Sequence, residues 1–197
     1  MRTGIFGGTF NPPHLGHRKA LENFIKNASL DKAIVTVTGT PPHKKLLRVV
    51  SDEDRLKMAE IAFGDISEVS DFEIQRGGKS YTIDTLEYFK QYDDDLYLYM
   101  GSDMILNIET VWHRFEDIFK ICTVVVLSRT GDDLNKLNTH AKYLKDKYGA
   151  NIKVFETSPF VVSSTQIREK IKNGADFSGY LPAAVEKYIK ENNLYKC

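Results

Sequence analysis

Short runs of apolar residues alternate along this chain with longer segments in which apolar residues recur every three or four positions. The apolar runs predict buried strands, which lie at Thr3–Phe6, Ala33–Thr38, Tyr97–Met100, Thr123–Leu127 and Asn151–Phe155. The segments between them predict helices. Because strands that alternate with helices are joined by right-handed crossovers, the pattern predicts an α/β fold, an open parallel sheet with helices on both faces.

Polar residues mark where several of these helices begin. Ser51, followed by Asp54, predicts an N-cap and an acidic first turn ahead of a buried face formed by Leu56, Ala59, Ile61 and Ala62. Ser163 and Gln166 have the spacing of a capping box. The last helical segment, residues 182–192, predicts a helical cap at the C-terminal end, from about residue 160.

Composition bounds the class of protein. A chain of 197 residues with 42% hydrophobic content is long enough for one core, so we expect a single domain over residues 1–197. Lys plus Arg and Asp plus Glu are equal at 27 each, which gives no global basic field for nucleic acid. Two cysteines and no long apolar run indicate a cytoplasmic protein without a membrane anchor. The oligomeric state stays open, a homo-oligomer included.

The segment Gly4–His17 carries the strongest chemical signal. Gly7 and Gly8 follow a strand end and let the backbone turn sharply and approach a ligand. A helix is predicted to begin near Leu15, so His14 and His17 fall on one face of its first turn. Helix N-termini favour anions. The segment therefore predicts phosphoryl chemistry.

Other phosphate and metal motifs do not account for this segment. Two histidines three residues apart can form half of a zinc site, but Cys122 and Cys197 lack metal-ligand spacing relative to them. No G-x-G-x-x-G follows the first strand, and no Walker loop exists in the chain. The nearest imitation, residues 78–80, has Glu73 where the motif needs glycine, so we expect an ordinary loop there.

The order Gly-Gly-Thr-Phe-Asn-Pro-Pro-His-Leu-Gly-His resembles the signature of the HxGH nucleotidylyltransferase superfamily. Further segments resemble the bacterial nicotinate mononucleotide adenylyltransferases in particular. In chain order they are Pro41–Lys44, Arg55 with Met58, Ser80–Leu86, Gly101–Asp103, Trp112, Ser128–Arg129 and Ser163–Arg168. The resemblance covers nearly the whole chain and implies a Rossmann-like fold.

The resemblance implies transfer of AMP from ATP to nicotinate mononucleotide, giving deamido-NAD and pyrophosphate. It implies catalytic roles for His14, His17 and Arg168. The residues expected to bind ATP with them are Gly7, Gly8, Thr9, Phe10, Gly101, Asp103, Ser128, Arg129, Ser164 and Thr165. The mononucleotide is expected at Lys44, Thr82, Thr85, Asp103 and Trp112. Mg²⁺ is expected as a cofactor bound mainly through the ATP phosphates, without a protein metal motif.

Several of these residues also have structural interpretations. Lys44 could be a solvent-facing lysine, Asp103 could cap a helix from Met104 onward, and Trp112 could be a core aromatic in one helix with Phe115 and Ile118. Two other functions stay open as well: a phosphopantetheine-type adenylyltransferase, and a nucleotide-binding sensor without turnover. Between acceptors, we expect nicotinate to be preferred over nicotinamide mononucleotide.

Overall fold

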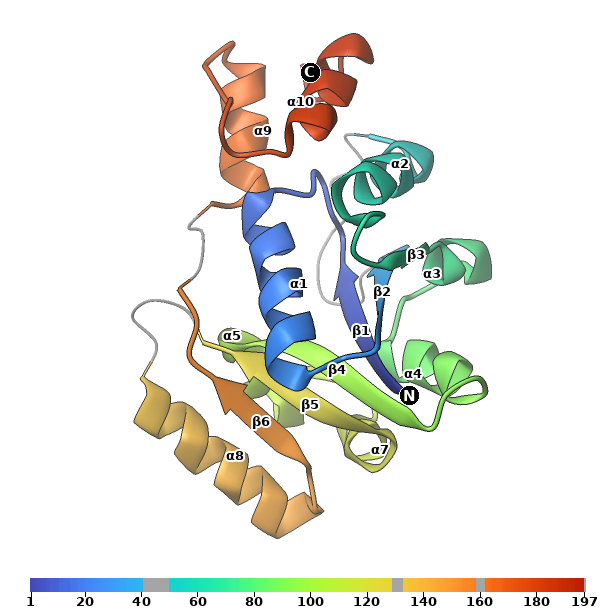
Figure 1. Ribbon diagram of the computed structural model, residues 1–197, viewed down its shortest axis with the longest axis vertical. Helices are drawn as coiled ribbons and strands as arrows, with labels where there is room; N and C mark the ends of the chain where they lie inside the picture. The colour runs from blue at the N-terminus through green and yellow to red at the C-terminus, as the bar shows by residue number, and fades with distance from the viewer. Residues whose placement is uncertain (41–49, 129–132, 159–161, 197) are drawn as a thin grey trace.

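The computed structural model describes residues 1–40, 50–128, 133–158 and 162–196 of the chain. Its centre is a six-stranded parallel sheet in the order β3-β2-β1-β4-β5-β6 (Figure 1). The strands are β1 (Arg2–Gly8), β2 (Lys32–Val37), β3 (Glu68–Ser70), β4 (Asp95–Gly101), β5 (Cys122–Leu127) and β6 (Ile152–Phe155). This is the Rossmann-like arrangement that the alternating pattern predicted, and its strand order reverses between β1 and β4.

All five predicted strands are present, with ends that differ from the prediction by at most two residues. The sequence did not predict β3, which has three residues and no apolar run and lies at an edge of the sheet beside β2. Val69 is its one aliphatic residue and is only partly buried. A strand so short and so exposed leaves no periodic pattern to read.

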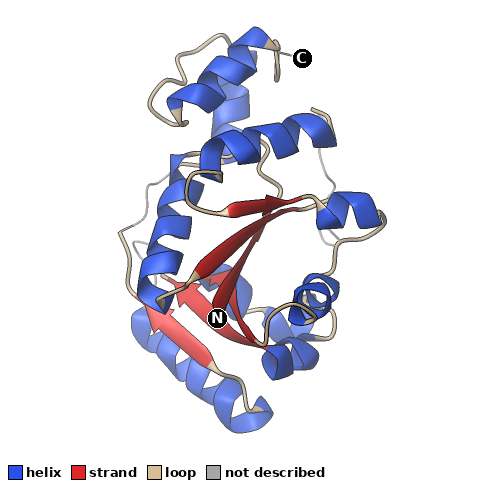
Figure 2. Cartoon of the chain, turned by 45° about the vertical axis from the view of Figure 1, so that its right-hand side comes forward, coloured by secondary structure: helices blue, strands red, loops and turns tan. Residues whose placement is uncertain are grey.

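Helices cover both faces of the sheet (Figure 2). They are α1 (Leu15–Ala28), α2 (Asp52–Phe63), α3 (Phe72–Arg76), α4 (Thr82–Lys90), α5 (Ser102–Ile105), α6 (Ile108–Val111), α7 (Phe115–Ile121), α8 (Leu134–Tyr148), α9 (Ser164–Lys172) and α10 (Ala183–Glu191). Successive strand residues point to opposite faces, so Phe6 joins the core cluster of α1 and α2. Ile5 joins the cluster of α4 to α8 on the other face.

The predicted helix starts are confirmed. The Ser51 side chain accepts from the Asp54 N–H at the start of α2, and Ser163 forms a complete capping box with Gln166 at the start of α9. The predicted buried face of α2 is only partly right. Ala59 and Ala62 are buried, but the predicted Leu56 and Ile61 are half-buried; the other buried residues of the helix are Arg55, Met58 and Phe63. Residues 78–80 are loop, as predicted.

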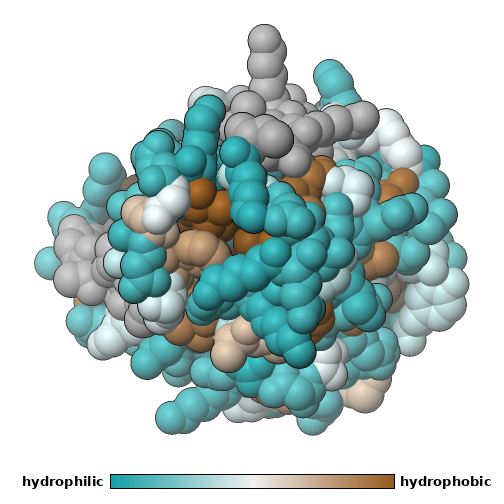
Figure 3. Space-filling model, turned by 90° about the horizontal axis from the view of Figure 1, so that it is seen from above, coloured by the Kyte–Doolittle hydropathy of each residue, from teal (hydrophilic) through white to brown (hydrophobic). Residues whose placement is uncertain are grey.

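The C-terminal helices α9 and α10 lie together at one end of the molecule, beyond the N-terminus of α1 (Figure 1). Val185 and Ile189 of α10 belong to the same core cluster as α1 and α2, and the Tyr188 hydroxyl donates to Asp54 Oδ1 at 2.9 Å. Seen from this end, the surface is mostly hydrophilic, with hydrophobic side chains between the polar ones (Figure 3). No helix in the described ranges has the length and apolar character needed to cross a membrane.

Candidate active site

The two predicted histidines cap the first turn of α1 reciprocally. His14 is the N-cap residue, and its Nδ1 accepts from the His17 backbone N–H at 3.2 Å. The His17 Nδ1 accepts in turn from the His14 backbone N–H at 3.2 Å. The two rings are stacked with centroids 3.6 Å apart. A backbone N–H can only donate, so neither Nδ1 carries a proton and each neutral ring carries its proton on Nε2.

The surroundings of this pair keep His14 neutral. His14 is buried, and desolvation lowers its pKa from 6.5 to about 4. Phe10 meets the His17 ring edge to face, with centroids 5.2 Å apart. Phe10 is itself buried with a φ of 46°, in the left-handed region. The imidazole pair is therefore held as two neutral N–H donors at a helix N-terminus, a suitable receptor for phosphate oxygens.

Side chains from distant parts of the chain hold the carbonyl groups of the loop that precedes His14. Arg55 Nη1 donates to the Thr9 carbonyl at 2.8 Å. Arg168 Nη1 donates to the Asn11 carbonyl at 2.7 Å, and the Ser164 hydroxyl donates to the Pro12 carbonyl at 2.8 Å. The loop between β1 and α1 is thus fixed by α2 on one side and by α9 on the other.

The start of α9 therefore lies against the histidine loop, as the predicted site requires. The Ser164 hydroxyl has a single proton and gives it to Pro12, so this hydroxyl cannot donate to a phosphate in the same arrangement. The Thr165 hydroxyl accepts from Arg168 Nη2 at 3.0 Å, and its own proton stays available. Arg168 uses two of its five N–H groups in these contacts within the described residues.

The remaining residues predicted for ATP are placed at strand ends. Gly7 and Gly8 close β1, with Thr9 following them, and Gly101 closes β4, the neighbour of β1 in the sheet. Asp103 is exposed in α5, but the helix-cap interpretation of this residue is wrong, because Gly101 is the N-cap.

Ser128 follows β5 and is buried, its N–H bonded to Phe155 and its carbonyl to Thr157. These bonds hold Ser128 in place beside β6. Arg129, which was predicted with it, lies outside the described residues.

On the acceptor side, α4 begins at Thr82, which is partly buried. Thr85, one turn later, is buried, and its hydroxyl donates to Glu73 Oε1 at 2.8 Å. Any contact of Thr85 with a ligand through that proton would break this bond. Lys44, the other residue predicted for the mononucleotide phosphate, lies outside the described residues.

Glu73 is a buried carboxyl group surrounded by hydroxyls. Desolvation raises its pKa above the ordinary value, while the hydrogen bond from Thr85, the nearby Ser80 hydroxyl and the positive charge of Arg76 oppose that rise. The Ser80 oxygen also accepts from the Gly39 and Thr40 backbone N–H groups at 3.1 and 3.3 Å. Glu73 thereby connects the N-terminal turn of α4 to the segment that follows β2.

Trp112 lies between two short helices. It follows α6, whereas Phe115 begins α7, so the expectation of one helix that contains Trp112, Phe115 and Ile118 is wrong. The indole is half-buried against the second core cluster. It also lines a shallow surface hollow of about 400 Å³, together with His113 and Arg114.

Two buried charged residues near these loops, Arg55 and Glu73, had no role predicted from the sequence. Arg55 had a readable signal: it stands in line with Met58, Ala59 and Ala62 on the buried stripe of α2. A charged residue on such a stripe needs partners inside the protein. Glu73, in a helix of five residues, gave no comparable signal.

Comparisons with known proteins identify the family of the chain. The cytidylyltransferase-like family matches residues 5–170. A protein of Clostridium botulinum strain Eklund 17B, described as a probable nicotinate-nucleotide adenylyltransferase, is 40% identical over 99% of this chain and 98% of its own. A protein of Thermoanaerobacter with the same description is 36% identical over 100% of this chain and 95% of its own.

Solved structures support the fold. The nicotinic acid mononucleotide adenylyltransferase of Plasmodium falciparum, solved in complex with NaAD, aligns with a TM-score of 0.79. The alignment covers 98% of this chain and 97% of that one, at 18% identity. The chain belongs to the cytidylyltransferase-like family, and its relatives place it among the nicotinate-nucleotide adenylyltransferases.

Proposed function

We propose that the protein transfers AMP from ATP to nicotinate mononucleotide, with deamido-NAD and pyrophosphate as products. The observation that carries the proposal is the reciprocal cap of His14 and His17, which occupies both Nδ1 atoms as acceptors and makes Nε2–H the donor of each ring. The descriptions of the relatives supply the substrate class.

The reaction needs positioning more than proton transfer. A 5′-phosphate oxygen of the mononucleotide attacks the α-phosphorus of ATP, and the bond from that phosphorus to the bridging oxygen of the β-phosphate breaks. The nucleophile is already an anion, so no general base is required. What lowers the barrier is alignment of the two phosphates and stabilisation of the charge that develops on the oxygens of the α-phosphate.

The histidine pair suits this task. In our proposal, the Nε2–H groups of His14 and His17 donate to oxygens of the transferred phosphate. Neutral donors can stabilise the developing charge, because a donor fixed in position needs no reorganisation as the charge develops. The N-terminus of α1 adds its own positive field at the same place.

The pyrophosphate end of ATP is proposed to bind at the start of α9. Arg168 keeps N–H groups beyond those bound to Asn11 and Thr165, and a planar guanidinium suits two phosphate oxygens at once. The Thr165 hydroxyl and the backbone N–H groups of Ser164 and Thr165 are further donors, whereas the Gln166 N–H is bonded to the Ser163 cap. Ser164 would act through its backbone, because its hydroxyl holds the loop.

Magnesium is proposed to reach this site bound to the phosphates of ATP. Within the described ranges, no three His, Cys, Asp or Glu side chains are grouped closely enough to hold a metal. Mg²⁺ commonly keeps several waters and binds substrate phosphates with one or two carboxylates, and the exposed Asp103 beside the end of β4 is available for such a contact. Bound there, the ion would neutralise phosphate charge.

The acceptor is proposed to lie between the start of α4 and Trp112. Thr82 stands in the first turn of α4, where backbone N–H groups favour the ring carboxylate, and the indole offers a surface for the pyridine ring. Thr85, one turn later, anchors this end of α4 through its hydrogen bond to Glu73. Lys44 stays a prediction for the mononucleotide phosphate.

A product assay tests the proposal. Purified protein is incubated with ATP, Mg²⁺ and one acceptor at a time: nicotinate mononucleotide, nicotinamide mononucleotide or 4′-phosphopantetheine. We expect pyrophosphate and the deamido dinucleotide with the first acceptor. Turnover only with 4′-phosphopantetheine would support the other adenylyltransferase class, and ATP binding without turnover would support a sensor.

A further inference from the structure

Arg55 is a fully buried guanidinium near the proposed site. Its side chain is 0% exposed, although it lies on α2, a helix whose first turn is acidic and whose outer face is in solvent. Burial of a charge is costly unless hydrogen bonds and a counter-charge compensate for it. Arg55 has both kinds of compensation, hydrogen bonds to backbone carbonyls and an ion pair.

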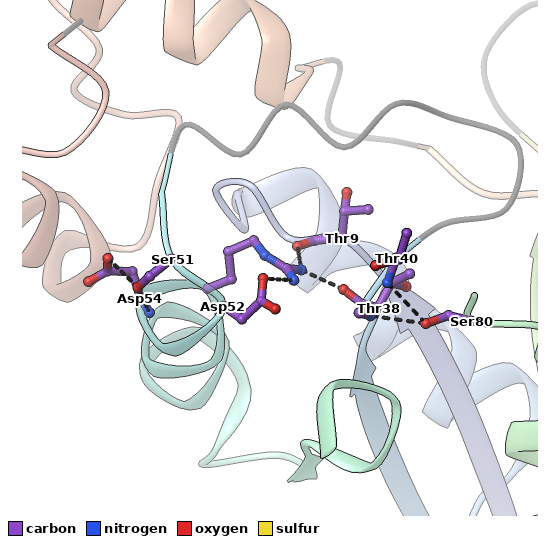
Figure 4. A network of polar contacts seen from close by, with 9 residues as sticks. Thr9, Thr38, Thr40, Ser51, Asp52, Asp54 and Ser80 are labelled. Atoms are coloured by element: carbon purple, nitrogen blue, oxygen red, sulfur yellow. Dashed lines mark hydrogen bonds and ion pairs between the residues drawn. The ribbon is translucent and has the colours of Figure 1, made fainter. Parts of the chain in front are cut away.

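One atom of Arg55 joins two loops. Nη1 donates to the Thr9 carbonyl at 2.8 Å and to the Thr38 carbonyl at 2.7 Å (Figure 4). The Thr38 N–H donates in turn to the Gly8 carbonyl at 2.9 Å. Thr38, the residue after β2, is therefore bonded directly to the last residue of β1 and through Arg55 to the loop that follows β1.

The counter-charge lies on a different atom. Arg55 Nη2 donates to Asp52 Oδ1 at 2.8 Å, and Asp52 belongs to the first turn of the same helix (Figure 4). The Asp52 side chain is 37% exposed, so this ion pair lies at the rim. The contacts with Thr9 and Thr38 can therefore be separated from the ion pair by substitution.

We propose that Arg55 is a positioning residue for the transferase reaction: through the Thr9 carbonyl it sets where the loop delivers His14 and His17. The inference rests on the proposed function and goes beyond it, since Arg55 touches neither histidine in the contacts that the structure gives. Only four residues separate Thr9 from His14, so a shift of the Thr9 carbonyl is passed to the start of α1. Misplacement of a reacting group by about 1 Å can cost about 100-fold in rate.

A merely structural role would give a different result. If Arg55 only filled the core, its loss would lower stability and leave the kinetics of the remaining folded protein unchanged. If it positions the loop, the turnover number falls in protein that is fully folded. The two alternatives are separated by comparing variants of matched stability.

The test uses Arg55→Lys, with Asp52→Asn and Leu144→Ala as controls. Lysine keeps the charge but replaces the fork by a single nitrogen on a different reach, so it cannot reproduce the bonds to both carbonyls and to Asp52. Asp52→Asn weakens the ion pair and leaves both carbonyl contacts. Leu144→Ala leaves a cavity in the other core cluster, in α8, and lowers stability without touching the loop.

Steady-state kinetics are measured below the unfolding transition of each variant, which circular dichroism locates. We expect kcat of Arg55→Lys to fall about tenfold to 100-fold. We expect the KM for the mononucleotide to change less than about twofold, and both controls to keep wild-type kcat. An Arg55→Lys variant with the kcat of Leu144→Ala would overturn the proposal.

A second readout does not depend on turnover. In imidazole ¹⁵N spectra of the ligand-free protein, Arg55→Lys should shift the signals of the two capping histidines, whereas Asp52→Asn should leave them in place. If lysine prevents folding, Arg55→Gln replaces it in both experiments, and wild-type histidine signals in the substituted protein would contradict the proposal. An inactive wild-type protein with shifted histidine signals in Arg55→Lys would refute the transferase function and retain the positioning of the loop.

Discussion

Substitution of His17 separates the cap that this side chain forms in the structure from the donor role that we propose for it. Its Nδ1 caps the His14 backbone N–H, and its Nε2–H is proposed to meet the transferred phosphate. His17→Ala removes both. His17→Gln removes the imidazole but keeps a side chain suited to the cap, since glutamine at this helix position reaches back to the N-cap N–H. The chain already uses this solution at the start of α9, where Gln166 caps Ser163 at 3.0 Å.

The expected magnitudes follow from these contacts. Loss of one preorganised donor lowers kcat by about 10²–10³, so the kcat of His17→Ala should be lower than that of the wild type by this factor. Loss of the back-cap leaves a partly buried N–H without its partner, which should cost about 1 kcal/mol of stability. His17→Gln should stay within about 0.5 kcal/mol of the wild type, because its cap is retained. Its kcat should still fall by about tenfold or more, because the glutamine amide does not occupy the position of the imidazole Nε2.

The assay combines urea unfolding, followed by circular dichroism, with initial rates of pyrophosphate release at saturating ATP. The glutamine variant should be nearly as stable as the wild type, but its kcat should be reduced, as that of the alanine variant is. A glutamine variant within about threefold of wild-type kcat would refute the donor role of His17. A glutamine variant as unstable as the alanine variant would refute the cap.

Three further outcomes are expected from other residues. Burial lowers the pKa of His14 to about 4, so the native state binds this proton less readily than the unfolded state does. The free energy of unfolding should therefore fall by about 1.4 kcal/mol for each pH unit between pH 6.5 and 4. His14→Ser keeps a cap without a titrating ring and should flatten that slope in urea titrations. Glu73→Gln should keep the bond from Thr85 and the wild-type stability at pH 7, whereas Glu73→Ala should lose about 1–3 kcal/mol by leaving buried hydroxyls unbonded, which thermal unfolding would show; equal losses in both would mean that the charge itself is needed. Trp112→Ala should lower kcat/KM for nicotinate and nicotinamide mononucleotides alike, and a changed ratio in competition assays would show that the indole discriminates acid from amide.

The parts of the fold that could be predicted from sequence are those whose signal is local. The strands β1, β2, β4 and β5 leave short apolar runs because both faces of the sheet are covered, and the edge strand β6 leaves a weaker run interrupted by Lys153. The caps at Ser51 and Ser163 were readable because cap and partner stand three residues apart. The histidine pair was readable for the same reason, although the sequence did not show that the two rings cap each other.

What could not be predicted depends on contacts between distant residues. Arg168 meets the Asn11 carbonyl across 157 positions and Arg55 meets Thr9 across 46, distances over which spacing in the sequence carries no information. Trp112 was expected in one helix with Phe115, but Arg114 between them has a φ of 52° and the chain turns there. A left-handed conformation at an arginine is set by its surroundings rather than by its intrinsic preference.

These long-range contacts explain how the loop that precedes His14 is held in one conformation. The loop from Thr9 to Pro13 has two prolines, which supply no N–H, and a phenylalanine in the left-handed region, so it cannot join a strand ladder or a helix. Its buried carbonyls still need donors. Arg55, Ser164 and Arg168 supply them, and two of these three belong to the helix that is proposed to hold pyrophosphate. If pyrophosphate binds at α9 as proposed, it contacts the same helix that holds the histidine loop, and the position of the leaving group would then be coupled to that of the donors at the transferred phosphate.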